Sequence, residues 1–95
     1  MYETDLFHYD LAKQRYGEKI IEEWRISDPE REEDEFLRIS KVGKKYYVIY
    51  GVVPWDYGFE SDYEVFVFDS WKELEINEKI RSLRKMFQEW GERTR

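Results

Sequence analysis

The single histidine, His8, has carboxylates close to it in the sequence, at Asp5 and Asp10. An imidazole beside carboxylates is the chemistry of a general base or of a metal ligand. The chain has no second histidine and no cysteine with which His8 could complete a strong ligand set. We therefore expect neither a catalytic residue nor a bound metal here, and nothing in the sequence calls for a cofactor.

Carboxylates are the other residues able to do chemistry, because 22 of the 95 residues are acidic. Paired carboxylates can serve as general acid and base. In so acidic a chain, however, two neighbouring carboxylates do not mark a specific site. No hydroxyl or amine has a recognisable activating partner either. We expect a protein that is not an enzyme; a concave pocket holding two carboxylates with displaced pKa values would indicate the opposite.

An aromatic segment follows Pro54, where Trp55, Tyr57 and Phe59 alternate with small or acidic residues. In an extended backbone this alternation places the three rings on one side. The rings either fold back to cover the core of a small domain or stand out as anchors for a partner. Both interpretations stay open. The acidic residues around the rings disfavour a phosphate-rich ligand.

An acidic strip spans residues 27–35, which contain six acidic residues and one arginine. One interpretation is a solvated connection that self-repulsion keeps extended. The other is a docking strip for a basic partner. Under that second interpretation Glu32, Glu33 and Glu35 are the candidate binding residues.

Basic residues gather at two other places. Arg81, Arg84 and Lys85 lie together near the chain's end, and Lys44 and Lys45 follow a glycine. The first group is either the solvated side of an amphipathic helix or a surface that contacts phosphates together with the second group. The second possibility makes nucleic-acid binding the alternative function.

The elements that must position these residues begin with a sheet over residues 36–68, where β-branched and aromatic residues are dense. Gly43 predicts a tight hairpin turn between strands 36–42 and 45–53. Pro54 ends the second strand, and a third strand is expected over 63–68. The predicted register sets Leu37 opposite Tyr50 and Ile39 opposite Val48.

Helices are expected on either side of this sheet in the sequence. Asp10 is a suitable N-cap for a helix over 10–25, which Asp28-Pro29 follows. Ser70 and Glu73 form a capping box that begins a helix over 70–90. A slip in its apolar stripe predicts a kink, or a second helix capped by Asn77. The fold class is thus α+β: helix, three-stranded antiparallel meander and helix, with both helices on one sheet face.

The predicted core holds Leu37, Ile39, Val48 and Tyr50. Four further side chains are expected to be buried with them: Trp24, Trp71, Leu83 and Phe87. The opposite sheet face is too apolar to be left freely exposed, because it carries Tyr47, Ile49, Phe66 and Phe68. Exposed patches of that kind mark interfaces, so a homodimer or a bound partner is predicted there.

Ninety-five residues predict one domain over 1–95, in which residues 1–9 are a tail or an edge strand and 91–95 a tail. Charged residues reach 40% of the chain and aromatic residues 19%, which indicates a folded, highly charged domain. Abundant Glu, Lys and Arg with few thermolabile residues is typical of proteins from hot environments. The absence of cysteine, of an apolar run long enough for a membrane and of a signal-peptide pattern predicts a cytoplasmic location.

Charge is unevenly distributed along the chain. Residues 1–76 carry 19 acidic and 10 basic residues, whereas residues 77–95 carry 3 acidic and 6 basic residues. An acidic surface repels nucleic acid and attracts basic proteins. The sequence therefore predicts a small non-enzymatic interaction or regulatory module that binds another protein, including the case in which its carboxylates mimic the charge of a nucleic acid.

Overall fold

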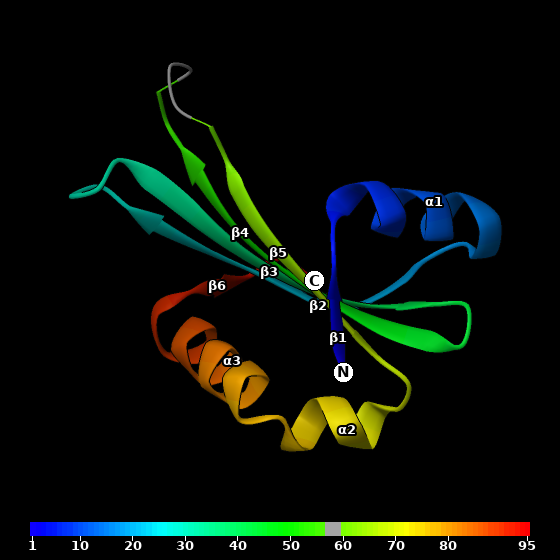
Figure 1. The fold of residues 1–95 in the computed structure, drawn as a ribbon. Helices are drawn as coiled ribbons and strands as arrows, with labels where there is room; N and C mark the ends of the chain where they lie inside the picture. The colour runs from blue at the N-terminus through cyan, green and yellow to red at the C-terminus, as the bar shows by residue number, and fades with distance from the viewer. Residues whose placement is uncertain (57–59) are drawn as a thin grey trace.

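The computed structural model describes residues 1–56 and 60–95 as one antiparallel sheet with helices on both faces (Figure 1). The elements are β1 (Tyr2–Thr4), α1 (Leu6–Tyr16), β2 (Lys19–Asp28), β3 (Glu33–Val42), β4 (Lys45–Pro54), β5 (Asp62–Phe68), α2 (Trp71–Ile76), α3 (Glu78–Trp90) and β6 (Glu92–Arg93). The strands lie in the order β1-β5-β4-β3-β2-β6. The first and last strands of the chain therefore form opposite edges of the sheet.

The expected three-stranded meander with helices on one face is wrong, because the sheet has six strands and is covered on both sides. The three expected strands do form, within β3, β4 and β5. Their predicted register is confirmed, since Leu37 pairs with Tyr50 and Ile39 with Val48. The missing strands are β1, β2 and β6, which flank this central hairpin unit.

The helix expected over 10–25 is also wrong. Asp5, not Asp10, caps α1, and its side chain accepts a hydrogen bond from the His8 amide at 2.8 Å. Gly17 ends α1 because it adopts a φ of +75°, a left-handed conformation that glycine tolerates best. The chain then turns back as β2 and pairs along β3.

Two separate cores lie on the two faces of the sheet. Side chains on one face pack against α2 and α3, and this larger core consists of Leu37, Ile39, Val48, Phe66, Phe68, Leu74, Ile80 and Phe87. Side chains on the other face pack under α1, and this smaller core consists of Tyr9, Val42, Tyr47, Ile49, Val65 and Val67. Figure 1 shows the sheet between α1 and the pair α2–α3.

The expected single apolar face that groups Tyr47, Ile49, Phe66 and Phe68 outside the chain's own core is wrong for two reasons. Tyr47 and Ile49 are buried under α1. Phe66 and Phe68 face the other way, because Phe66 pairs with Val48 in the larger core. The surface on which a homodimer was expected is therefore filled by the chain itself, and the homodimer stays a prediction.

The predicted break in the C-terminal helix is confirmed. Ser70 caps α2, and Asn77 caps α3 by accepting a hydrogen bond from the Ile80 amide at 3.2 Å. Phe87 is fully buried, as expected. Four other side chains expected in the core are only half-buried and pack against it: Trp24, Tyr50, Trp71 and Leu83.

One buried ion pair joins the sheet to α3. Glu22 of β2 is 6% exposed, and its two carboxylate oxygens accept hydrogen bonds from Arg84 at 2.9 and 3.2 Å. The bidentate geometry satisfies both groups, which a buried charge requires. Arg84 also lies over the ring of Trp71, 5.6 Å from its centre. This pair fixes α3 against β2.

Within residues 1–56 and 60–95, no helix is both long and apolar enough to cross a membrane.

Candidate functional site

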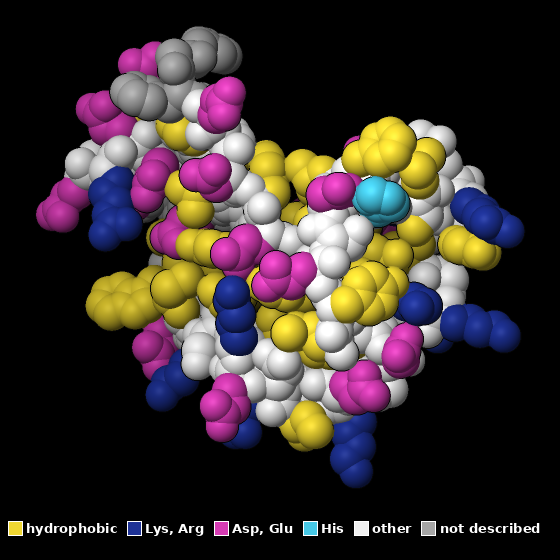
Figure 2. Space-filling model, viewed as in Figure 1, with side chains coloured by type: hydrophobic (Ala, Val, Ile, Leu, Met, Phe, Trp, Pro, Cys, Tyr) yellow, Lys and Arg dark blue, Asp and Glu magenta, His cyan; other side chains and the backbone are white. Residues whose placement is uncertain are grey.

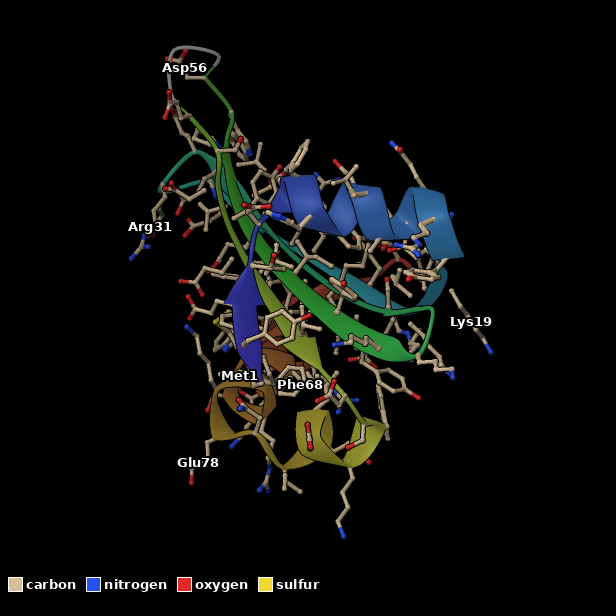
Figure 3. All side chains as sticks on the ribbon, turned by 45° about the vertical axis from the view of Figure 1, so that its right-hand side comes forward. Met1, Lys19, Arg31, Asp56, Phe68 and Glu78 are labelled. Atoms are coloured by element: carbon tan, nitrogen blue, oxygen red, sulfur yellow. The ribbon has the colours of Figure 1, made fainter. Side chains whose placement is uncertain are left out.

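Strands β2, β3, β4 and β5 are successive neighbours in the sheet, and their pairing brings two acidic segments to the same end of it. We call this end the acidic tip and define it as residues 28–35, 54–56 and 60–64. It holds ten acidic residues and one basic residue, Arg31. The β2–β3 turn and the β4–β5 connection meet there, because Glu33 pairs with Pro54 and Val52 with Asp62. Figure 2 shows the resulting cluster of acidic side chains, and Figure 3 labels Arg31 and Asp56 within it.

Five of these carboxylates share one face of the sheet. Residues opposite each other across strands, or two apart along a strand, point to the same side. In β3, Glu33 and Glu35 lie four and two positions before Leu37 of the larger core. In β5, Asp62 and Glu64 lie four and two positions before Phe66 of the same core. In β2, Asp28 pairs with Glu33 and therefore points to the same side. The five are Asp28, Glu33, Glu35, Asp62 and Glu64.

Few basic groups neutralise this row of carboxylates. Among the described residues, Arg31 approaches Asp28 at 3.9 Å and Glu33 at 3.8 Å, and Lys79 of α3 approaches Glu64 at 3.1 Å. Both basic side chains are at least half exposed, and ion pairs of this kind contribute little to stability. Glu35 accepts a hydrogen bond from the Tyr50 hydroxyl. Burial, followed by this bond, raises the pKa of Tyr50, which keeps the hydroxyl protonated as the donor.

Asp34 differs from the other acids because it points to the opposite face and holds the tip together. Its carboxylate accepts a hydrogen bond from Trp55 Nε1 at 2.9 Å and pairs with Arg25 at 3.3 Å. The hydrogen bond from Trp55, with smaller help from Ser27 and Arg25, lowers the pKa of Asp34. Trp55 also donates its backbone amide to the Glu32 carbonyl at 2.8 Å.

On its α1 side the molecule is hollowed beside the tip (Figure 2). A cleft of about 390 Å³ separates α1 from the sheet there. Gly51 forms part of the cleft and lies under the ring of Tyr63, which a Cβ at Gly51 would approach to 2.6 Å. Arg38, also in its wall, donates to Glu23 and contacts the hydroxyl of Tyr9. The two faces of the tip therefore differ in chemistry.

The structure brings together most of the residues predicted to bind a basic partner. Glu32, Glu33 and Glu35 lie in or beside the β2–β3 turn, and Trp55 lies across from them with its side chain tied to Asp34. Trp55 is 49% exposed, so one part of its ring is anchored and another part is accessible. Tyr57 and Phe59 lie outside the described residues.

The residues predicted to bind nucleic acid are not brought together. Lys44 and Lys45 lie at the β3–β4 turn, on the opposite side of the molecule from α3, which carries Arg81, Arg84 and Lys85 (Figure 1). Arg84 is already bound to Glu22, as described above. The two groups form separate basic surfaces.

Sequence reasoning placed Asp28 in the acidic strip without naming it as a candidate binding residue, and it missed the contribution of Asp62 and Glu64 to the tip. Asp62 and Glu64 alternate with Tyr63, a pattern that marks one face of a strand as acidic. Their proximity to the acidic strip depends on strand pairing and is not visible in the local sequence.

No group of three or more possible ligand side chains among residues 1–56 and 60–95 is arranged to hold a metal ion. His8, the one histidine, is exposed and hydrogen-bonded through Nδ1 to Asp5 at 2.7 Å. The hydrogen bond from the His8 backbone amide, followed by this ring bond, lowers the pKa of Asp5.

Comparisons with known proteins found no match to a family model, to a curated protein or to a solved structure.

Proposed function

We propose that this protein is a small non-enzymatic interaction module that binds a basic surface of another protein through its acidic tip. The observation that carries this proposal is the row of five carboxylates on one face of the tip. Crowding so many negative charges on one surface with few basic neighbours favours attraction of a positively charged partner.

The spacing of the row resembles that of a nucleic-acid backbone. Same-face residues along a strand are about 6.8 Å apart, and neighbouring strands are about 4.8 Å apart. Duplex DNA also presents phosphates at intervals of several ångströms along each strand. A basic surface that normally contacts phosphates can therefore meet several carboxylates at once, which makes charge mimicry the specific form of the proposal.

The partner is thus a basic protein, in particular one that handles DNA or RNA. The lack of cysteine fits a reducing compartment, so the proposal includes a cytoplasmic location.

The test compares two variants with the same change in net charge. The tip variant carries Glu33→Gln, Glu35→Gln and Asp62→Asn. The control variant carries Glu75→Gln, Glu89→Gln and Glu92→Gln, three exposed positions away from the tip. Fluorescence anisotropy with a labelled Lys/Arg-rich peptide gives the affinity of each protein at several salt concentrations.

We expect the tip variant to bind the peptide about tenfold more weakly than the wild type, and the control variant to change less than about twofold. Salt should weaken wild-type binding more steeply than binding of the tip variant. Equal losses in both variants would show that net charge alone attracts the peptide, and the proposal would fail. A follow-up measures whether the wild type displaces duplex DNA from a basic DNA-binding protein.

A second candidate function is direct nucleic-acid binding, which the basic surface near the β3–β4 turn favours. Residues 13–19 and 41–45, which we call the basic end, hold six basic residues and one acidic residue. Labelled duplex RNA, duplex DNA and single strands titrated with salt would test it. Steep weakening with salt, together with loss of binding in Lys44→Ala/Lys45→Ala, would support this function.

A further inference from the structure

A hollow at the basic end lies far from the acidic tip and has the features of a ligand site. It has a volume of about 570 Å³ and lies between the last residue of α1, the β3–β4 turn and β1. Its wall includes the side chains of three tyrosines and two lysines: Tyr2, Tyr16, Tyr47, Lys44 and Lys45. Ligand sites in proteins are of this size, mainly apolar and equipped with a few polar groups.

The tyrosine rings form the apolar wall. Tyr47 belongs to the smaller core and is only 8% exposed. Tyr16 lies against the turn, since a Cβ at Gly43 would stand 3.1 Å from its Cγ. Because Gly43 has no side chain, the Tyr16 ring can pack on the turn backbone. Tyr16 stays 58% exposed, which leaves part of its ring accessible to a ligand.

Several polar groups of the wall have no protein partner. The hydroxyls of Tyr16 and Tyr47 make no hydrogen bond to any residue that the structure describes, and Lys44 makes no ion pair within the same residues. Solvent reaches the Tyr47 hydroxyl although the side chain as a whole is buried, so a ligand in the hollow can contact it. Burial raises the pKa of Tyr47, so its hydroxyl is a hydrogen-bond donor at neutral pH.

The charge around the hollow selects an anion. Tyrosine rings alone also attract cations, as in aromatic cages. Here two lysines, Lys44 and Lys45, line the hollow, and their positive charge disfavours a cationic ligand. Lys45 already pairs with Asp69 at 3.4 Å and packs 5.2 Å from the centre of the Tyr2 ring. Lys44 and the free hydroxyls are therefore the groups available to an anion.

We propose that this hollow binds a small aromatic phosphate, such as a nucleoside monophosphate, with its ring against Tyr16 and its phosphate on Lys44. The hydroxyl of Tyr47 donates to the phosphate or to the ring substituents. The proposal is independent of the acidic tip, because the hollow lies at the other end of β3 and β4.

The experiment titrates the full chain with four probes and follows binding by calorimetry and by amide chemical shifts. The probes are adenosine monophosphate, phenyl phosphate, adenosine and inorganic phosphate. We expect the two aromatic phosphates to bind at least about tenfold more tightly than adenosine or inorganic phosphate, because only they engage both ring and lysine. The largest shifts should fall in the β3–β4 turn and at the end of α1.

The two aromatic phosphates distinguish the source of the ligand. Tighter binding of adenosine monophosphate assigns the site to nucleotides, whereas equal binding of phenyl phosphate assigns it to aromatic phosphates generally. If neither aromatic phosphate binds at a ligand concentration of about 10 mM, any remaining affinity is too weak to matter in a cell, and the proposal is overturned.

Matched variants locate the site. Lys44→Ala removes an exposed turn lysine and should weaken adenosine monophosphate binding about tenfold. Lys41→Ala is the control, because Lys41 lies three residues earlier, faces the ring of Tyr46 and is absent from the hollow. Tyr47→Phe keeps the ring and removes the free hydroxyl, so its weaker binding would reflect that donor and not a packing defect. Equal losses in Lys44→Ala and Lys41→Ala would overturn the proposal in favour of general attraction to the basic end.

Discussion

The two ends of the sheet present opposite charges on the same three strands. The acidic tip has ten acidic residues and one basic residue, whereas the basic end has six basic residues and one acidic residue. In Figure 3 the labelled Arg31 and Asp56 of the tip and Lys19 of the basic end lie on opposite sides of the molecule. The net charge of −6 therefore conceals a strongly dipolar protein.

The turns at the two ends of β3 meet the same conformational demand with different residues. Gly43 has a φ of +63° in the β3–β4 turn, and Glu32 has a φ of +54° in the β2–β3 turn. Glycine adopts this conformation without steric cost, whereas glutamate does so at a cost of about 1–2 kcal/mol. The turn at the basic end is therefore unstrained at Gly43, whereas the turn at the tip has a charged residue, Glu32, in a strained backbone conformation.

The largest expected effect comes from the buried pair between the ends. Glu22→Ala leaves Arg84 without its carboxylate, so the free energy of unfolding should fall by about 3 kcal/mol. Arg84→Ala should have a similar effect, and the double variant should lose less than the two single losses combined. Urea unfolding measures all three. Asp62→Asn, at an exposed position of the tip, is the comparison and should change stability by less than about 0.5 kcal/mol. A loss as large as that of Glu22→Ala would show that tip charges also stabilise the fold.

At the basic end, Gly43→Ala should lower the free energy of unfolding by about 1–2 kcal/mol, because a Cβ is strained at positive φ and meets the Tyr16 ring. Lys44→Ala is the control in the same turn and should leave stability within about 0.5 kcal/mol of the wild type. Thermal or urea unfolding of both variants tests this. An undiminished stability in Gly43→Ala would remove the contrast between the turns.

At the tip, the opposite sign is expected. Glu32→Gly relieves the positive φ and should raise the free energy of unfolding by up to about 1 kcal/mol, the gain being reduced by the greater freedom of glycine in the unfolded chain. Glu32→Gln keeps the strain and removes the charge, and therefore separates backbone strain from repulsion among the acids. Equal stabilisation by both variants would assign the effect to repulsion.

The smallest expected effect is a pH dependence from Asp34. Its pKa is lowered in the folded state from an ordinary value of 3.8, so the unfolded state takes up a proton first as the pH falls. The stabilisation is complete above this value and is lost as the pH falls through the lower folded pKa. Urea midpoints measured between about pH 6 and pH 2.5 should decline less steeply in Asp34→Asn and in Trp55→Phe than in the wild type. Parallel declines in all three proteins would show that other carboxylates dominate.

The sequence predicts the centre of this fold better than its edges. The β3–β4 hairpin could be predicted from the sequence because Gly43 and the alternation around Leu37 and Ile39 are local signals. β2 was not, because a bulge between Ile20 and Glu22 breaks its alternation. Its inward-facing Glu22 also looks like a surface residue until Arg84, 62 positions later, is placed beside it. Because neither the bulge nor the Glu22–Arg84 pair is visible in the local sequence, this segment was wrongly predicted as a helix.

The candidate site divides in the same way. Glu32, Glu33 and Glu35 form a contiguous acidic run that composition alone reveals. Their union with Asp62 and Glu64 depends on the register of β3, β4 and β5, which no single segment encodes. The hollow at the basic end likewise depends on Tyr2, Tyr16 and Tyr47. These residues come from three separate elements and meet only in the folded chain.

The two outermost strands have a consequence for handling the protein. β1 covers Val65–Val67 of β5 and β6 covers Trp24 and Arg25 of β2, so two very short strands shield the edges of a long sheet. Removal of residues 1–4 would expose an apolar, strand-forming edge that can pair with another molecule. Trimming at this end would therefore promote aggregation of folded molecules, and a purification tag is best separated from β1 by a polar linker.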